Sequence, residues 1–177
     1  MRRNDENWIL TYTGKKFYPT DPRPAEICIE DIAHALANLC RYAGHSEDFY
    51  SVAEHSCLIA EKAPPSYRKW ALLHDATEAY VVDMPRPVKR FLKEYRAIEE
   101  RLLWAVAGHF GLSLPIPDEI IELDNRILLD ERNTFFKPPF PSWGEAIEKL
   151  QPIGVEPQGL YPLTARKWFL EMWELIR

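Results

Sequence analysis

The sequence lacks a hydrophobic run long enough to cross a membrane. Its longest stretch without a formal charge extends from Leu102 to Pro117 and is interrupted by Gly108 and Gly111. A membrane-spanning helix needs about 20 consecutive, mainly apolar residues. The residues up to Leu10 also lack the apolar segment of a secretory signal peptide. We therefore expect a cytoplasmic protein with no membrane partner.

Cysteine is scarce, and positive charge is not in excess. Cys28, Cys40 and Cys57 are odd in number and form no C-x-x-C pair, so neither a thiolate zinc site nor a redox pair is expected. We interpret them as buried free thiols. The 22 basic and 27 acidic residues give a formal net charge of −5, which argues against duplex nucleic acid as a partner. A small anionic substrate needs only a local positive pocket.

Several widespread catalytic motifs are also missing. The sequence contains neither the G-x-x-x-x-G-K-[ST] phosphate loop nor the G-x-G-x-x-G dinucleotide motif. It lacks H-E-x-x-H, which excludes a protease of the zincin type. No internal repeat is visible.

The chain does contain the pattern of a mainly helical domain. Its 177 residues, 46% hydrophobic and 28% charged, suffice for one globular domain with a sizeable core. Apolar residues recur with the helical period in several segments. We predict a single, mostly α-helical domain over 1–177, with a small irregular or β element at the N-terminus. Its predicted parts are an arm over 1–28 with a short hairpin (8–13 and 14–18), a helical core over 29–135 with helices at about 29–40, 51–62, 67–81, 94–110 and 117–134, a proline-rich loop over 137–163 and a last helix over 164–177.

Capping residues define the expected helix ends. Ser51 and Glu54 have the spacing of a capping box, in which each side chain bonds the backbone N–H of the other residue. Ser66 and Thr164 are suitable caps for the helices that follow them. Gly111 is a suitable residue for ending a helix.

Two short stretches carry ionisable side chains in apolar surroundings. One holds His55, and the other holds His74, Asp75 and Glu78 between runs of apolar residues. Imidazoles and carboxylates are rarely fully buried unless they are paired or bind a metal. If 67–81 is one helix, His74 and Glu78 share a face and Asp75 lies about 100° around the axis. These side chains therefore predict a functional site.

A second carboxylate must come from further along the chain. Asp124 lies inside an apolar helical stretch and is the natural donor, with Asp130 and Glu131 as the alternatives. Two imidazoles and two carboxylates suit one divalent transition metal, such as Mn, Fe, Co, Ni or Zn, and in some sites Mg. Such an ion lowers the pKa of water and clamps phosphoryl oxygens. Glu78, beside this set, is then available as a general acid or base.

At these residues the chain resembles the HD-domain metal-dependent phosphohydrolases, whose ligand pattern is H…HD…D. The resemblance is greatest to the small bacterial and phage enzymes that hydrolyse nucleotides, which include 5′-deoxynucleotidases and phage dATP triphosphohydrolases. It covers about residues 29–131. The matching stretches are 31–36 (DIAHAL), 40–45 (CRYAGH), 49–56 (FYSVAEHS), 74–80 (HDATEAY), 83–89 (DMPRPVK) and 95–99 (YRAIE).

The resemblance implies a role for each matching position, and it implies a homo-oligomer. The implied metal ligands are His55, His74, Asp75 and Asp124, the implied proton-transfer residue is Glu78, and the implied substrate-binding residues are Arg41, Asp83 and Lys89. An apolar stripe on the last helix, which includes Trp168 and Trp173, fits either the core or an oligomer interface. Residues 137–177 match no site residue of the family.

The sequence leaves several functions open. The first is hydrolysis of a dNTP, dATP-like, to nucleoside and triphosphate, which the cationic residues near Lys89 favour over 5′-deoxynucleotidase activity on dNMPs. A non-catalytic nucleotide-binding regulatory module is a further alternative, disfavoured because all five ligand and acid positions are filled. A cyclic-dinucleotide phosphodiesterase would need a Gly-Tyr-Pro element and further metal ligands, which are not visible. The aromatic residues of the arm fit either base stacking or the core; they are Trp8, Tyr12, Phe17 and Tyr18.

Overall fold

The structure, a computed structural model, describes residues 6–177 and is mainly α-helical with one small hairpin, as predicted. The hairpin pairs β1 (Ile9–Leu10) with β2 (Lys16–Phe17) in antiparallel fashion. Residues 1–5 of the predicted arm, including most of the start inspected for a signal peptide, lie outside the described residues. The helical elements are η1 (Pro24–Glu26), α1 (Ile29–Asn38), η2 (Arg41–Gly44), α2 (Val52–Lys62), η3 (Pro65–Tyr67), α3 (Arg68–Leu73), α4 (Glu78–Val81), α5 (Arg86–Lys89), α6 (Lys93–Phe110), α7 (Asp118–Phe135), α8 (Glu145–Glu148) and α9 (Pro162–Ile176).

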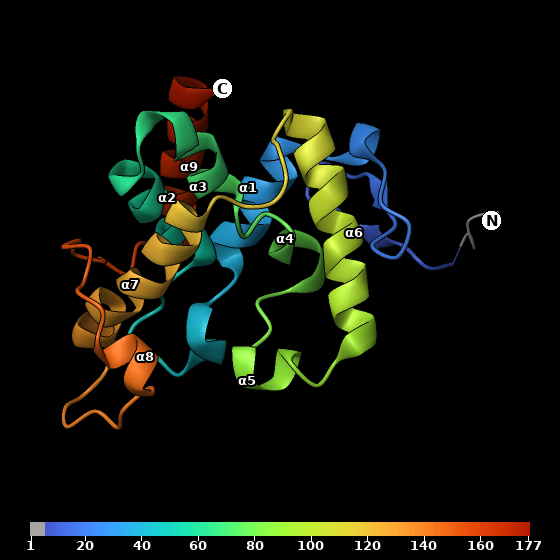
Figure 1. Ribbon diagram of the computed structural model, residues 1–177. Helices are drawn as coiled ribbons and strands as arrows, with labels where there is room; N and C mark the ends of the chain where they lie inside the picture. The colour runs from blue at the N-terminus through green and yellow to red at the C-terminus, as the bar shows by residue number, and fades with distance from the viewer. Residues whose placement is uncertain (1–5) are drawn as a thin grey trace.

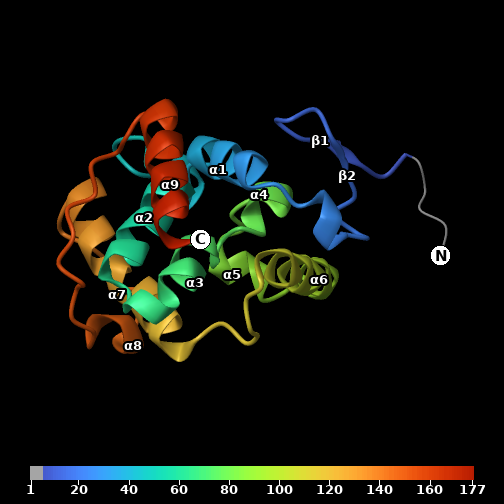
Figure 2. The same cartoon turned by 90° about the horizontal axis from the view of Figure 1, so that it is seen from above.

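The helices surround one hydrophobic core. Helix α9 packs against α1, α2 and α3, and α7 also packs against α2. In two perpendicular views, α4 and α5 lie between α7 and α6 (Figures 1 and 2). The core joins distant parts of the chain, since Phe17, Ile59 and Phe169 are all fully buried in it. Trp173 of the predicted apolar stripe is buried, and Trp168 packs against the core from a partly buried position. No helix within residues 6–177 combines the length and the apolar character needed to span a bilayer.

The segment 67–81 is not one helix, contrary to the prediction. It consists of η3, α3 and α4, with a tight turn over 74–77 between the two α-helices. Around this turn, backbone N–H groups bond carbonyls three residues earlier. The imidazole of His74 bonds the Ala71 carbonyl at 2.7 Å, which is the acceptor that Asp75 would use in an uninterrupted helix. The side chain of His74 therefore takes a backbone carbonyl that a continuous helix would use for its own hydrogen bond.

Helix ends agree with the prediction only in part. Ser51 caps α2 by accepting the Glu54 N–H at 3.1 Å, and Gly111 ends α6 in the left-handed conformation. Ser66 lies inside η3 and caps nothing, and α9 begins at Pro162 instead of being capped by Thr164. The predictions for Ser66 and Thr164 are therefore wrong. In both places a proline at the start of the helical element fixes the backbone earlier than the expected cap.

The side chain of Glu54 does not complete a capping box. Its two oxygens instead accept the backbone N–H groups of Gln158 at 2.6 Å and Leu160 at 2.7 Å. Gly159, between them, has a φ of +65°, and a Cβ there would meet the carbonyl oxygen of Phe49 at 3.0 Å. A buried carboxylate on α2 thus holds the proline-rich segment against the core.

Asp130 of α7 holds the same segment at a second point. Its carboxylate accepts the backbone N–H groups of Ile153, Gly154 and Val155 at 2.8 to 3.2 Å. The segment 137–163 is therefore held by long-range hydrogen bonds, although α8 is its only regular element before α9 begins at Pro162.

Replacing Asp130 by asparagine should lower the free energy of unfolding. Both oxygens of Asp130 accept backbone N–H groups, and in asparagine one of them becomes an NH₂ group that cannot accept. At least one backbone N–H then loses its partner, at an expected cost of about 1–3 kcal/mol. Urea denaturation followed by circular dichroism measures this loss. The control is Glu119→Gln on the exposed face of the same helix, and equal stability of the two variants would contradict the assignment.

The three cysteines are free, as predicted, but only Cys57 is buried. Cys28 and Cys40 lie at the two ends of α1 and are partly exposed. The prediction of burial is therefore correct for one of the three thiols.

Candidate metal centre

Four predicted ligand residues meet where α2, the 74–77 turn and α7 come together. The Nε2 atoms of His55 and His74 lie 3.3 Å apart. Asp75 Oδ2 lies 3.2 Å from His74 Nε2 and 3.5 Å from His55 Nε2, and Asp124 Oδ1 lies 3.3 Å from His55 Nε2. The α7 carboxylate on the Nε2 side of both histidines is that of Asp124.

The hydrogen bonds behind the two imidazoles fix which nitrogen faces the site. His74 Nδ1 lies 2.7 Å from the Ala71 carbonyl oxygen, and His55 Nδ1 lies 2.6 Å from Glu131 Oε1. Carbonyl and carboxylate oxygens only accept, so each Nδ1 carries the proton and donates it. In the neutral form of each imidazole the lone pair is therefore that of Nε2, which faces the space between the four side chains, as in metal-binding histidines.

The distances and charges of this cluster fit a divalent cation. Ligand atoms about 2.0–2.2 Å from one ion lie roughly 3 Å from each other. The distances given above are 3.2–3.5 Å, and His74 Nε2 lies 4.0 Å from Asp124 Oδ1. One ligand atom each of His55, His74 and Asp124 lies within 4.8 Å of the other two. Burial opposes protonation of His74, yet Asp75 and Asp124 outweigh it and raise the pKa of His74 to about 9. Burial likewise opposes ionisation of Asp75, but the charge of His74 lowers its pKa to about 2. The carboxylates of Asp75 and Asp124 therefore stabilise positive charge in the space between the four side chains.

Glu131 supports the cluster from behind, a role that the sequence did not reveal. It is fully buried and accepts hydrogen bonds from His55 Nδ1, from Tyr50 at 2.8 Å and from Tyr42. Arg41 Nη2 lies 3.2 Å from its other oxygen. Burial opposes ionisation, but Arg41 and His55 lower the pKa of Glu131 to about 2. The spacing of Asp124 and Glu131, two helical turns apart on one face of α7, was the available signal.

Replacing Glu131 by glutamine should weaken metal binding by roughly 10- to 100-fold. The amide cannot accept all the donors that now converge on it, and a buried Arg41 without its partner should cost roughly 3–5 kcal/mol of stability. Titration calorimetry with Mn²⁺ or Zn²⁺ and urea denaturation measure the two effects. Asp130→Asn is the matched neighbour, since it should lose stability with unchanged metal affinity. Unchanged metal affinity in Glu131→Gln would contradict the supporting role.

Glu78, the predicted proton-transfer residue, begins α4 beside the cluster. It is 8% exposed, and its Oε2 is buried with no hydrogen-bond partner among the described residues. Burial, and then the charges of Asp75 and Asp83, raise the pKa of Glu78 well above its usual range. Such a carboxyl group can hold a proton near neutral pH and transfer it.

The three predicted substrate-binding residues also lie at the site. Arg41 is buried, with Nη1 3.7 Å from Asp75 Oδ2, and its Nε has no partner among the described residues. Lys89 forms an ion pair with Glu99. Asp83 is half-buried, and burial raises its pKa. Arg41 and Lys89 therefore already have carboxylate partners that a bound phosphate would have to share.

Arg86 orients the remaining carboxylate. Its Nη2 lies 2.5 Å from Asp124 Oδ2, and its Nη1 donates to Asn125 Oδ1 at 2.9 Å. The ion pair holds the oxygen of Asp124 that does not face His55. Oδ1 is thereby directed toward the two imidazoles.

Two cavities open from this cluster, and Asp75, Glu78, Lys89 and Asp124 line both. The first cavity, about 550 Å³, runs along α6 and is called the basic cavity below for Lys89, Lys93 and Arg96, although Glu99 and Glu100 also line it. The aromatic cavity, about 670 Å³, is also lined by Arg41, Asp83, Arg86, Tyr42 and Trp143. Both volumes lie within the roughly 300–1,000 Å³ of small-molecule sites.

Comparison with known proteins identifies relatives of this chain. No family model matches the chain. The uncharacterized protein YfdR of Escherichia coli K12 is 40% identical over 126 residues, which cover 71% of each chain. An uncharacterized protein of Rhodobacter capsulatus is 42% identical over 123 residues, which cover 64% of this chain and 63% of the relative. The chain belongs to the family of the E. coli protein YfdR.

Proposed function

We propose that the protein is a metal-dependent phosphohydrolase of the HD type that acts on deoxynucleotides. The supporting observation is the convergence of two histidine Nε2 atoms and two carboxylates from three separate elements, beside buried Glu78, whose Oε2 has no hydrogen-bond partner among the described residues. Structural zinc sites are usually closed by four protein ligands, whereas catalytic sites keep a position open for water or substrate. This cluster borders two cavities.

His55, His74, Asp75 and Asp124 would hold the ion, with Mn, Co, Ni, Fe or Zn suited to this donor set. When bound, a divalent ion supplies an acidified water and offsets negative charge on a phosphoryl oxygen. Glu78 Oε2 holds or moves the proton, because it is buried beside the cluster and has no hydrogen-bond partner within residues 6–177. The Nε of Arg41 and the ammonium of Lys89 donate to phosphate oxygens, which stabilises the charge that grows during the reaction.

The substrate that this site favours is a deoxynucleoside triphosphate, hydrolysed to nucleoside and triphosphate. The basic cavity extends the cationic lining from Lys89 to Lys93 and Arg96, which gives a chain of phosphates more than one cationic partner. A dNMP would need only the cations next to the metal cluster. Activity as a 5′-deoxynucleotidase is the second candidate for that reason.

The test is hydrolysis by protein that has been stripped with a chelator and reloaded with Mn, Co, Ni, Zn or Mg. Each form is incubated with dATP and dAMP, and phosphate is resolved from triphosphate. Triphosphate released from dATP is the expected result. If phosphate is released from dAMP and dATP is not hydrolysed, 5′-deoxynucleotidase activity replaces triphosphohydrolase activity as the proposal. Absence of turnover with every metal, while nucleotide still binds, would overturn both in favour of a regulatory module.

A further inference from the structure

One wall of the aromatic cavity is formed by aromatic side chains that have no role in the proposed hydrolysis. Tyr42 and Trp143 line it, with ring centroids 5.9 Å apart and planes inclined by 22°. Phe136 meets Tyr42 and Trp143 edge-on at 5.1 and 6.1 Å. Trp143 remains 36% exposed. Arg132 lies over the indole ring, and the part of Trp143 that lines the cavity remains for aromatic contact with a ligand.

The protein fixes this wall in place from both sides. The backbone N–H of Trp143 donates to Glu148 at 3.0 Å. Arg132 pairs with the same glutamate at 2.6 Å and lies over the indole ring of Trp143. Tyr42 has a φ of 56°, a conformation that L residues adopt rarely, and its hydroxyl is tied to Glu131. Backbone strain of this kind persists only where the surroundings hold it, and it is frequent at binding sites.

The wall and the metal cluster belong to one cavity. Asp75, Glu78 and Asp124 line the same 670 Å³ space as Trp143. Leu128 and Pro85 also line this cavity, and Arg41 lies beside the cluster. A ligand that fits this space therefore combines a negatively charged group with a flat apolar group. The arm aromatics line neither cavity; Phe17 is buried and stacked on Tyr80.

We propose that Trp143, supported by Tyr42, is the stacking surface for the base of the nucleotide substrate. The inference rests on the proposed function and adds to it a subsite from the 137–163 segment. Stacking accepts the face of any base, so this wall favours nucleotides over base-free phosphates without selecting one base strongly.

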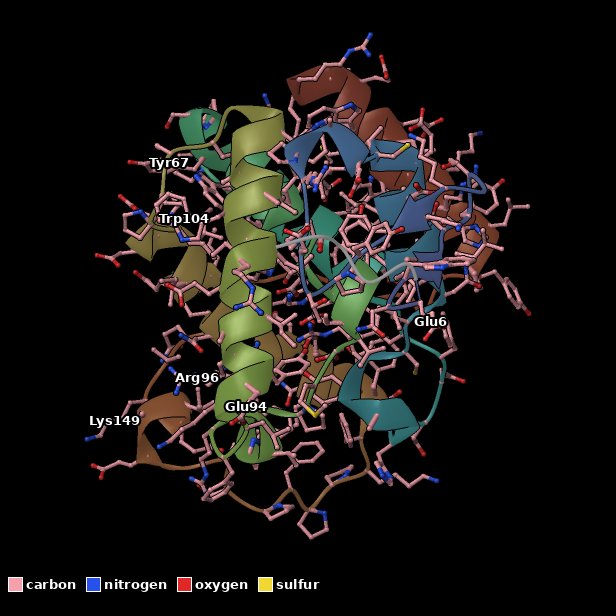
Figure 3. The ribbon with its side chains drawn as sticks, turned by 90° about the vertical axis from the view of Figure 1, so that its right-hand side faces the viewer. Glu6, Tyr67, Glu94, Arg96, Trp104 and Lys149 are labelled. Atoms are coloured by element: carbon pink, nitrogen blue, oxygen red, sulfur yellow. The ribbon has the colours of Figure 1, made fainter. Side chains whose placement is uncertain are left out.

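The test compares a nucleotide with its base-free counterpart. Binding of dAMP and of 2-deoxyribose 5-phosphate is measured by calorimetry on metal-loaded Glu78→Gln protein, in which hydrolysis is slowed, with and without Trp143→Ala. The expected result is that Trp143→Ala weakens dAMP binding by roughly 5- to 150-fold relative to 2-deoxyribose 5-phosphate. Trp143→Phe should restore most of the preference. The matched control is Trp104→Ala, because Trp104 is exposed on α6, labelled in Figure 3, and lines neither cavity.

The outcomes separate this inference from the proposed function. Equal weakening of both ligands, or none, in Trp143→Ala with unchanged circular dichroism would overturn the base subsite and leave the hydrolase proposal standing. If the wild-type protein shows no turnover with any metal, a base preference that depends on Trp143 would support the subsite and overturn the hydrolase. Loss of the preference in Trp104→Ala as well would also overturn the assignment to Trp143.

Discussion

Replacing His74 by alanine is expected to abolish tight metal binding and, with it, hydrolysis. The change removes one of the two Nε2 donors, and its effect on metal affinity should exceed the roughly 10- to 100-fold loss caused by removing a supporting residue. His74 also connects to Asp75 Oδ2 at 3.2 Å, so the remaining carboxylates lose a positive or hydrogen-bonding neighbour. Metal content after gel filtration, calorimetric titration and nucleotide turnover measure the loss.

The control for His74 is His109→Ala, since His109 is exposed at the end of α6. Because His74 also shapes the 74–77 turn, its replacement can disturb folding. Asp124→Asn provides a second route, since it alters an oxygen donor on α7 while preserving side-chain size. Full metal content and full turnover in a folded His74→Ala or Asp124→Asn protein would show that this cluster is not the metal centre.

Replacing Glu78 by glutamine is expected to leave the metal in place and to lower kcat by roughly 10²- to 10⁴-fold. The amide keeps the size of the side chain but cannot carry a transferable proton. The pH–rate profile should also lose the limb that belongs to the ionisation of Glu78. Steady-state kinetics across pH, together with metal content, separate this effect from loss of the ion. The control is Glu100→Gln, which alters an exposed acid lining the basic cavity.

Stability gives an independent check on Glu78→Gln. Burial raises the pKa of Glu78 above that of the unfolded chain. A raised carboxyl pKa contributes stability below the unfolded pKa, and this contribution is lost as pH rises through the folded pKa. At pH values above the folded-state pKa of Glu78, metal-free Glu78→Gln protein should therefore unfold at the same temperature as wild type or at a higher one. A clearly lower Tm would mean that the rate loss reflects damage to the fold and not to proton transfer.

Helix positions were predictable where local pattern and local caps agree. Helices α2, α6 and α7 match their predicted ranges to within a residue, because apolar periodicity, the Ser51 cap and Gly111 act within a few residues of each other. The prediction failed over 67–81, where the side chain of His74 competes for a backbone acceptor. Such competition depends on the rotamer that the site imposes, and periodicity carries no information about it.

The roles of the buried carboxylates could not be predicted, because their partners are far away in the sequence. Glu54 bonds the backbone around Gly159 instead of completing its capping box, and Asp130 bonds the segment at Gly154. Glu131 bonds His55, which lies on another helix. The sequence suggested a capping box for Glu54 and a place among the candidate ligands for Asp130 and Glu131, and tertiary packing supplied other partners for all three.

The sequence by itself determined the mainly helical fold and singled out His55, His74 and Asp75, and it left Asp124 open against Asp130 and Glu131. These features follow from residue type and spacing, which any single chain displays. Only the tertiary structure decided that Glu131 orients His55, and that Trp143 from a segment without recognisable motifs borders the same cavity as the metal cluster. The reason is physical: hydrogen-bond partners and cavity walls are set by which helices pack together, and that packing joins residues that the linear pattern leaves unconnected.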